Sequence, residues 1–166
     1  TISSGTTFGG GSSKKHKVGG TWTNNGSFTT GINDTVEFNG SGTQNISGSS
    51  VTQFRSIRIN KSTGSVVLTN NITTNSSGGE INIVSGTFDI ASYTCDRASS
   101  GGTFTVSSIG IFRLSGSSNF PTTYTTVSLA TSSLVEYYGT TQNISTQTYG
   151  NLTTSGSGVK TVSGNV

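Results

Sequence analysis

The 166-residue chain contains few of the residues that usually form or cross-link the core of a compact globular protein. It has one cysteine, one proline and no methionine, and only 9% of its residues are charged. A single cysteine excludes an intrachain disulfide, and a single proline without a glycine triplet period excludes collagen. The low charge also argues against a solvated disordered chain, which usually carries high charge.

Long apolar runs are missing as well. Hydrophobic residues make up 28% of the chain, and no run approaches the roughly 18 residues of a membrane span. We therefore expect no membrane insertion. The sequence contains no recognisable signal peptide and starts at Thr1, so we interpret it as a mature or trimmed segment.

Cations are few, although the formal net charge is +3. The only cluster is Lys14, Lys15 and Lys17 around His16. Nucleic-acid binding requires a basic stripe that neutralises several phosphates, and this sequence has none. We expect no nucleic-acid partner and interpret the lysine cluster as a solvated loop that keeps the protein soluble.

Small polar residues dominate what is present. The chain has 30 serines, 30 threonines, 24 glycines and 14 asparagines. Between them lie short β-branched and aromatic runs such as 35–38, 56–59 and 103–106, most of which alternate between apolar and polar residues. Alternation with period two indicates strands with one buried face, and no helical periodicity competes with it. The sequence predicts an all-β protein.

The sequence also repeats itself. Val36-Glu37-Phe38 returns as Val135-Glu136-Tyr137, and Thr43-Gln44-Asn45-Ile46-Ser47 returns unchanged as Thr141-Gln142-Asn143-Ile144-Ser145. We infer two out-of-phase copies of a unit of about 80–98 residues, approximately 1–81 and 82–166, with an insertion near 117–131. The whole chain, 1–166, is then one continuous repeat domain.

Two architectures fit such a unit, a parallel β-solenoid and a β-sandwich. We favour a right-handed parallel solenoid with coils of roughly 20 residues, because neighbouring coils share their core and each then needs few large apolar residues. Residues in matched repeat positions are expected to fill this core: Trp22, Phe38, Ile46, Phe104, Tyr137 and Ile144.

The motifs that carry this pattern resemble a known type of repeat. The segments Gly20–Phe28 and Val36–Gly48 are similar to the G-x-W-x-N-x-G-x-F and V-x-F-x-G-x-x-x-Q-x-I-x-G repeats of large secreted, adhesin-like surface proteins of Bacteroidetes-type bacteria. The resemblance implies a right-handed parallel β-solenoid, a secreted or cell-surface location and a fibrous or adhesive role. It carries over no catalytic residue.

The sequence offers few candidate residues for catalysis or metal binding. His16 is the only histidine and lies among lysines, and the six carboxylates do not suggest a converging pair. Glu37 and Glu136 occupy equivalent repeat positions, so we assign them to the scaffold. Cys95 is interpreted as core filler. We predict no catalytic, cofactor-binding or metal site, and thus no enzyme.

Ligand contacts are sought among aromatic and hydroxyl side chains instead. We select Tyr124, Tyr138, Thr123 and Thr125 as candidate surface contacts, because tyrosine rings can stack on sugars and threonine rows can order water. Thr-x-Thr triplets also start at Thr21, Thr103 and Thr146. These features leave a polysaccharide-binding or ice-binding module as the alternative function.

Our leading expectation is a structural or adhesive extracellular repeat protein. Neither end of the sequence shows the pattern of a polar cap or a capping helix, although the ends of a solenoid need one to protect their unpaired strand edges. We therefore expect head-to-tail self-association or stacking on further repeats, with surface polysaccharide as a second class of partner.

Overall fold

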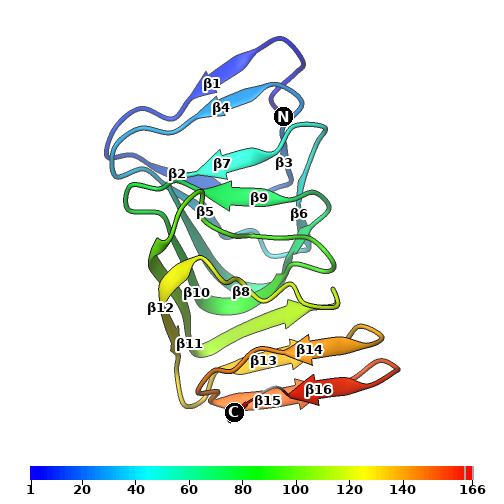
Figure 1. The fold of residues 1–166 in the computed structure, drawn as a ribbon. Coiled ribbons are helices and arrows are strands. Elements are labelled where there is room, and N and C mark those ends of the chain that lie inside the picture. Colours follow the sequence, from blue (N-terminus) through cyan, green and yellow to red (C-terminus); the bar gives the residue numbers. More distant parts are fainter. Residues whose placement is uncertain (163, 166) are drawn as a thin grey trace.

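The computed structural model describes residues 1–162 and 164–165. Within these residues the chain forms strands and turns arranged as a β-solenoid of about seven turns, which confirms the predicted fold class (Figure 1). The pairings between the strands are parallel, so the sandwich alternative is wrong. Among the described residues no helix is long and apolar enough to span a membrane.

Each turn of the solenoid runs over three faces, which we call B, C and A in chain order. Face B carries β1 (Thr7–Gly9), β4 (Ser27–Thr29), β7 (Thr52–Phe54), β9 (Ile72–Thr74), β14 (Gln142–Ile144) and β16 (Lys160–Val162). Face C carries β2 (Lys15–Val18), β5 (Thr35–Phe38), β12 (Tyr124–Leu129) and the first halves of β8 (Ser56–Leu68), β10 (Glu80–Asp89) and β11 (Gly101–Leu114).

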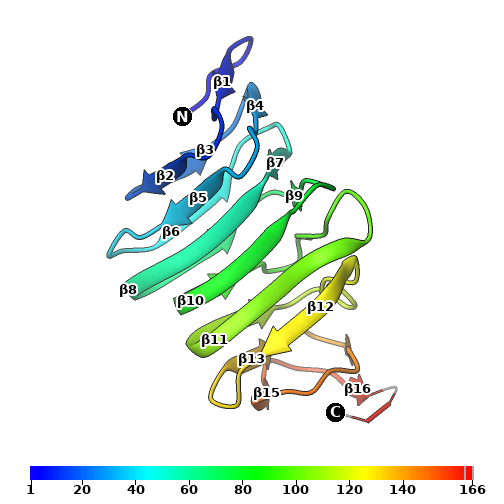
Figure 2. The same cartoon turned by 90° about the vertical axis from the view of Figure 1, so that its left-hand side faces the viewer.

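Face A carries β3 (Trp22–Thr23), β6 (Gln44–Ser47), β13 (Leu134–Tyr137) and β15 (Asn151–Thr154), together with the second halves of the three long strands. Faces A and C therefore belong to one curved sheet, because β8, β10 and β11 bend from one face to the other (Figure 2). Register shifts between Ile83 and Ser85 mark the bend in β10.

One turn takes 20 to 24 residues, as the pairs Lys15–Thr35 and Ile57–Ile81 illustrate. The last turn is shorter: Val135 pairs with Leu152. There the segment 145–150 leads from β14 directly to β15, without a strand on face C. The solenoid consequently tapers at its C-terminal end.

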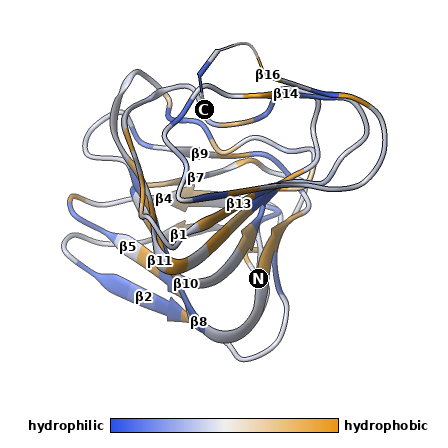
Figure 3. Ribbon diagram, turned by 90° about the horizontal axis from the view of Figure 1, so that it is seen from below, coloured by the Kyte–Doolittle hydropathy of each residue, from blue (hydrophilic) through white to orange (hydrophobic). Residues whose placement is uncertain are grey.

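The core is a set of apolar columns that run along the stack. On face C, Val36, Ile57, Ile81, Phe104 and Val127 are successive register partners. Side chains alternate in a strand, so these residues point inward while their neighbours point to solvent. The six residues expected in the core are all buried. Figure 3, which looks along the stack, shows the chain winding around this common interior.

The two copies of the sequence motif do not lie on the same face. Val36 belongs to β5 on face C, whereas its counterpart Val135 belongs to β13 on face A. In the same way, Ile46 lies in β6 on face A and Ile144 lies in β14 on face B. The repeated unit is thus a strand–corner–strand segment that fits two different corners. Residues 124–129, within the expected insertion, form β12 and pair in register with β11.

The lysine cluster is not a loop, which corrects the interpretation from sequence. Lys15, His16 and Lys17 form β2, the first strand of face C, and pair with β5. The period-two pattern was obscured because His16, on the inward side, is itself polar.

Candidate functional site

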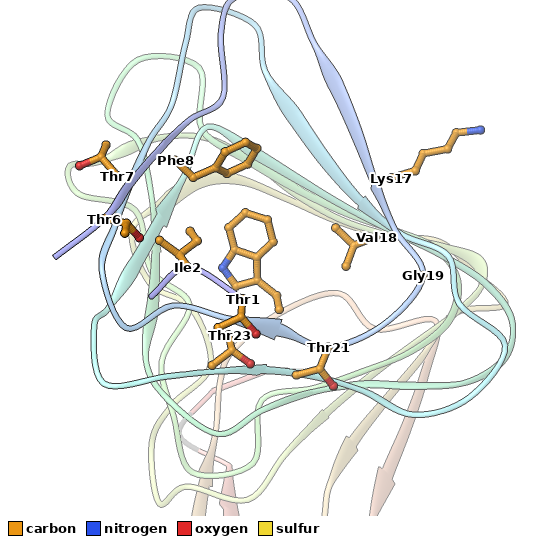
Figure 4. A pocket seen from close by; sticks show the side chains of 11 residues that line it. Thr1, Ile2, Thr6, Thr7, Phe8, Lys17, Val18, Gly19, Thr21 and Thr23 are labelled. Atoms are coloured by element: carbon orange, nitrogen blue, oxygen red, sulfur yellow. The ribbon is translucent and has the colours of Figure 1, made fainter. Parts of the chain in front are cut away.

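A hollow with an apolar wall lies at the N-terminal end of the stack. It has a volume of about 480 Å³, and its wall includes Ile2, Phe8, Val18 and Trp22. Figure 4 shows Ile2, Phe8 and Val18 around the hollow, with Lys17 extending away from it. The first turn of the solenoid places these residues together, so the hollow is the open end of the core.

An aromatic cluster forms the floor of this hollow. The rings of Trp22 and Phe28 meet edge to face with centroids 4.9 Å apart, and Phe8 stacks on Phe28 at 5.6 Å. The indole Nε1 of Trp22 donates a hydrogen bond to Oγ1 of Thr52, at 3.2 Å. Because its polar atom is satisfied inside the protein, the indole offers the hollow apolar surface only.

Phe8 is the most exposed ring of this cluster. Its side chain faces inward above Phe28, its register partner in the next turn, yet it is 40% exposed while Phe28 is 8% exposed. The difference arises because a turn covers Phe28 and no described residue stacks above β1. Phe8 therefore resembles a core residue whose covering turn is absent from the described chain.

The strands around the hollow also have unpaired edges. Among the described residues, β1 pairs only with β4 and β2 pairs only with β5. The backbone nitrogen of Ile2 donates a hydrogen bond to the carbonyl oxygen of Thr23. Parallel edges of this kind accept a further strand, because their outward N–H and C=O groups are otherwise bonded only to water.

The C-terminal end presents a second apolar surface. Leu152 is partly buried beneath Val135, and Val162, the register partner of Ile144, is 42% exposed. Beside them the hydroxyl of Tyr149 donates to the carbonyl oxygen of Ser145 at 2.7 Å and lies 2.9 Å from the hydroxyl of Tyr137. Tyr149 thus fills the interior of the narrowed last turn.

The ligand contacts selected from sequence do not form one site. Tyr124 is buried, and its hydroxyl donates to the carbonyl oxygen of Cys95 at 3.0 Å. Selecting it as a surface contact was wrong, because the first residue of β12 faces the core. Burial also raises the pKa values of Tyr124 and of the Cys95 thiol.

The other three candidates are tied to their own neighbours. Thr123 Oγ1 accepts from the backbone nitrogen of Arg97 and donates to Asp96. Thr125 is exposed on β12, and its hydroxyl donates to the carbonyl oxygen of Gly102 at 3.4 Å. Tyr138 is half-buried, and its hydroxyl donates to Asp89 at 2.8 Å. The Thr-x-Thr triplets lie in β3 and its approach, in β11 and after β14, and so do not form a single array.

The titratable residues serve local structure. A ring nitrogen of His16 donates to the carbonyl oxygen of Gly10 at 2.8 Å. Glu37 pairs with Lys15 and Arg58, and Glu136 pairs with Arg113. Hydrogen bonds from Ser155 and Arg113 lower the pKa of Glu136. No group of three metal-ligating side chains occurs among the described residues.

Sequence reasoning did not identify Phe8 as a site residue. The signal for Phe8 was the turn period, since Phe8 and Phe28 are separated by one turn of 20 residues. A search for family models, curated proteins and solved structures similar to this chain found no match.

Proposed function

We propose that this chain is a structural, adhesive repeat protein of the bacterial cell surface that assembles end to end into a fibre. The observation that carries the proposal is the aromatic hollow at the N-terminal end, with Phe8 placed as a core residue but left 40% exposed. The resemblance of Gly20–Phe28 and Val36–Gly48 to adhesin-like repeats supports a secreted location.

The partner at this end is a second copy of the chain. Each internal boundary between turns buries apolar columns and pairs parallel strands, and the N-terminal surface offers both features again. At the opposite end, Leu152 and Val162 continue the columns of Val135 and Ile144. Two different surfaces of one chain that pair with each other make a heterologous contact, which extends into a filament if it does not close into a ring.

Light scattering and electron microscopy of the full chain test this proposal. We expect elongated particles that grow with protein concentration. Phe8→Ser should weaken the association at least tenfold, whereas Ile32→Ser, a change at another exposed apolar residue in the corner between β4 and β5, should leave it unchanged. Phe8 is already partly exposed, so its replacement should preserve the fold.

A mixing experiment separates head-to-tail contact from other modes. Phe8→Ser blocks the N-terminal surface and Val162→Ser blocks the C-terminal surface. A mixture of the two variants retains one functional surface of each kind, so it should form dimers and nothing longer. A strictly monomeric wild-type chain at high concentration, or equal loss of association in Ile32→Ser, would refute the proposal.

A further inference from the structure

A polar cleft lies on the outer, lateral surface of face C and begins at β2, the first strand of that face. It has a volume of about 220 Å³ and is lined by Lys15, Thr35, Ser56, Ile57, Arg58, Glu80 and Asn82. These residues come from β2, β5, β8 and β10, which lie side by side in Figure 2. The cleft therefore crosses four successive turns of the solenoid.

The order of side-chain sizes creates the cleft. Along one outward row, Lys15 pairs with Thr35 and Ser56 pairs with Glu80, so two short side chains lie between two long ones. Neighbouring strands are about 4.8 Å apart, which places the backbones of Lys15 and Glu80 about 14 Å from each other. Arg58 and Asn82, register partners in the adjacent row, close the third side.

The charged groups in and beside the cleft are balanced in sign. Lys15 Nζ and Arg58 Nε each lie 3.1 Å from Oε2 of Glu37, whose side chain is almost fully buried. Glu80 supplies a second carboxylate and has no ion pair among the described residues. Two cations and two carboxylates cancel, so neither a polyanion nor a cation is favoured.

Hydrogen-bonding capacity is left unused around the same space. Asn82 Oδ1 is buried without a hydrogen-bond partner. The hydroxyls of Thr35 and Ser56 make no hydrogen bond to another described residue. A buried acceptor without a partner is unfavourable, and a hydroxyl that reaches Asn82 can donate to it while accepting from Arg58 or Lys15.

We propose that this cleft binds a single neutral sugar unit of a polysaccharide through its hydroxyl groups. Lys15 and Arg58 donate to the sugar, and Glu80 and Asn82 accept from it. A volume of about 220 Å³ equals roughly seven water molecules at liquid density, which is close to the size of one pyranose ring. Because face C lies on the side of the stack, the site stays open in an end-to-end assembly, and a filament presents it many times.

Binding of the dilute, monomeric chain to an array of neutral and acidic oligosaccharides tests this inference. We expect retention of a neutral glycan, confirmed with that glycan by titration calorimetry. Ser56→Leu fills the cleft and Glu80→Gln removes a charged acceptor, so each should weaken binding at least tenfold. Thr126→Leu, a matched small-to-leucine change on the outer side of β12 on the same face, should change binding less than twofold.

The two proposals fail independently, since the glycan measurement uses monomers and the association measurement uses no glycan. Binding only to acidic glycans, with loss at high salt, would overturn the inference, because it would show a simple cation effect. Absence of any retained neutral glycan, or equal weakening by Thr126→Leu, would overturn it as well. Circular dichroism of each variant confirms that the fold is intact.

Discussion

Gln44 and Gln142 make the same three hydrogen bonds at two different corners of the solenoid. Each side-chain Nε2 donates to two carbonyl oxygens of the preceding turn, those of Val18 and Gly20 for Gln44, and those of Leu114 and Gly116 for Gln142. Each Oε1 accepts from a glycine nitrogen, Gly40 or Gly139. The side chain of this glutamine therefore holds the repeated segment in place at a corner of the solenoid.

Gln44→Leu should lower the free energy of unfolding by about 3 kcal/mol, because it leaves buried backbone groups without partners. The loss also includes the contact with Lys61, whose Nζ lies 2.7 Å from Oε1 of Gln44. Urea unfolding followed by circular dichroism measures the change. Gln53→Leu, on the exposed side of β7, should shift the free energy of unfolding by less than about 0.5 kcal/mol. Equal effects of the two substitutions would contradict the stabilising role of Gln44 at the corner.

Ile46→Ala should destabilise the protein by about 2–5 kcal/mol, since Ile46 is buried in a core column and its truncation leaves a cavity. Ile109 is the matched control, because it is 71% exposed and its truncation creates no cavity. Thermal melting of both variants checks the prediction. If Ile46→Ala melted together with Ile109→Ala, the assigned register of β6 would be wrong.

Gly31→Ala should be destabilising by about 3 kcal/mol, because a Cβ atom at this position would overlap the backbone oxygen of Gly11 in the preceding turn. At Gly42 the same substitution meets open space and an ordinary φ angle, so Gly42→Ala should be neutral or slightly stabilising. Chemical denaturation of the two variants distinguishes them. A tolerant Gly31→Ala protein would show that the turns pack less closely than described.

Alkaline pH should destabilise the fold through its buried tyrosines. Burial raises the pKa values of Tyr137 and Tyr149 above 10.0, the ordinary value. Above about pH 10 the unfolded chain loses these protons while the folded chain retains them, so the free energy of unfolding falls as pH rises. Below pH 10 the contribution is complete.

Spectrophotometric titration measures this effect through tyrosinate absorbance. In the folded protein fewer tyrosines should ionise at pH 11 than in the same protein unfolded in urea. Tyr149→Phe removes one protected hydroxyl, so its stability should decline less steeply with pH. Complete ionisation near pH 10 without unfolding would show that Tyr137 and Tyr149 reach solvent.

The fold class could be predicted because local patterns determine it. Residues such as Ile57 and Phe104 alternate with polar neighbours, and so few apolar residues suffice only when turns share a core. The outward positions could not be predicted in the same way. From the sequence alone, Tyr124 is expected to be a surface aromatic residue. The pairing of Gly101 with Tyr124 instead places it at the start of β12, above a buried carbonyl oxygen.

The sugar cleft was beyond sequence reasoning for a related reason. Its residues Lys15, Ser56 and Glu80 lie on different strands and become neighbours only when the turn lengths are known. Turn lengths vary from 20 to 24 residues, so a fixed period does not align them. A single sequence shows which residues alternate, but it does not show which residues of successive turns lie side by side.

The two copies of the repeated segment lie on different faces, and this displacement affects how a longer protein of this kind would present its outward side chains. From Val36 on face C to Val135 on face A the chain completes four turns and one further face. If the segment around Val36 were duplicated again with the same offset, its outward side chains would reappear one third of a revolution around the axis. Three successive copies of this segment would then display the same residues in three directions, so a rod built by such duplication carries the chemistry of this segment as a spiral.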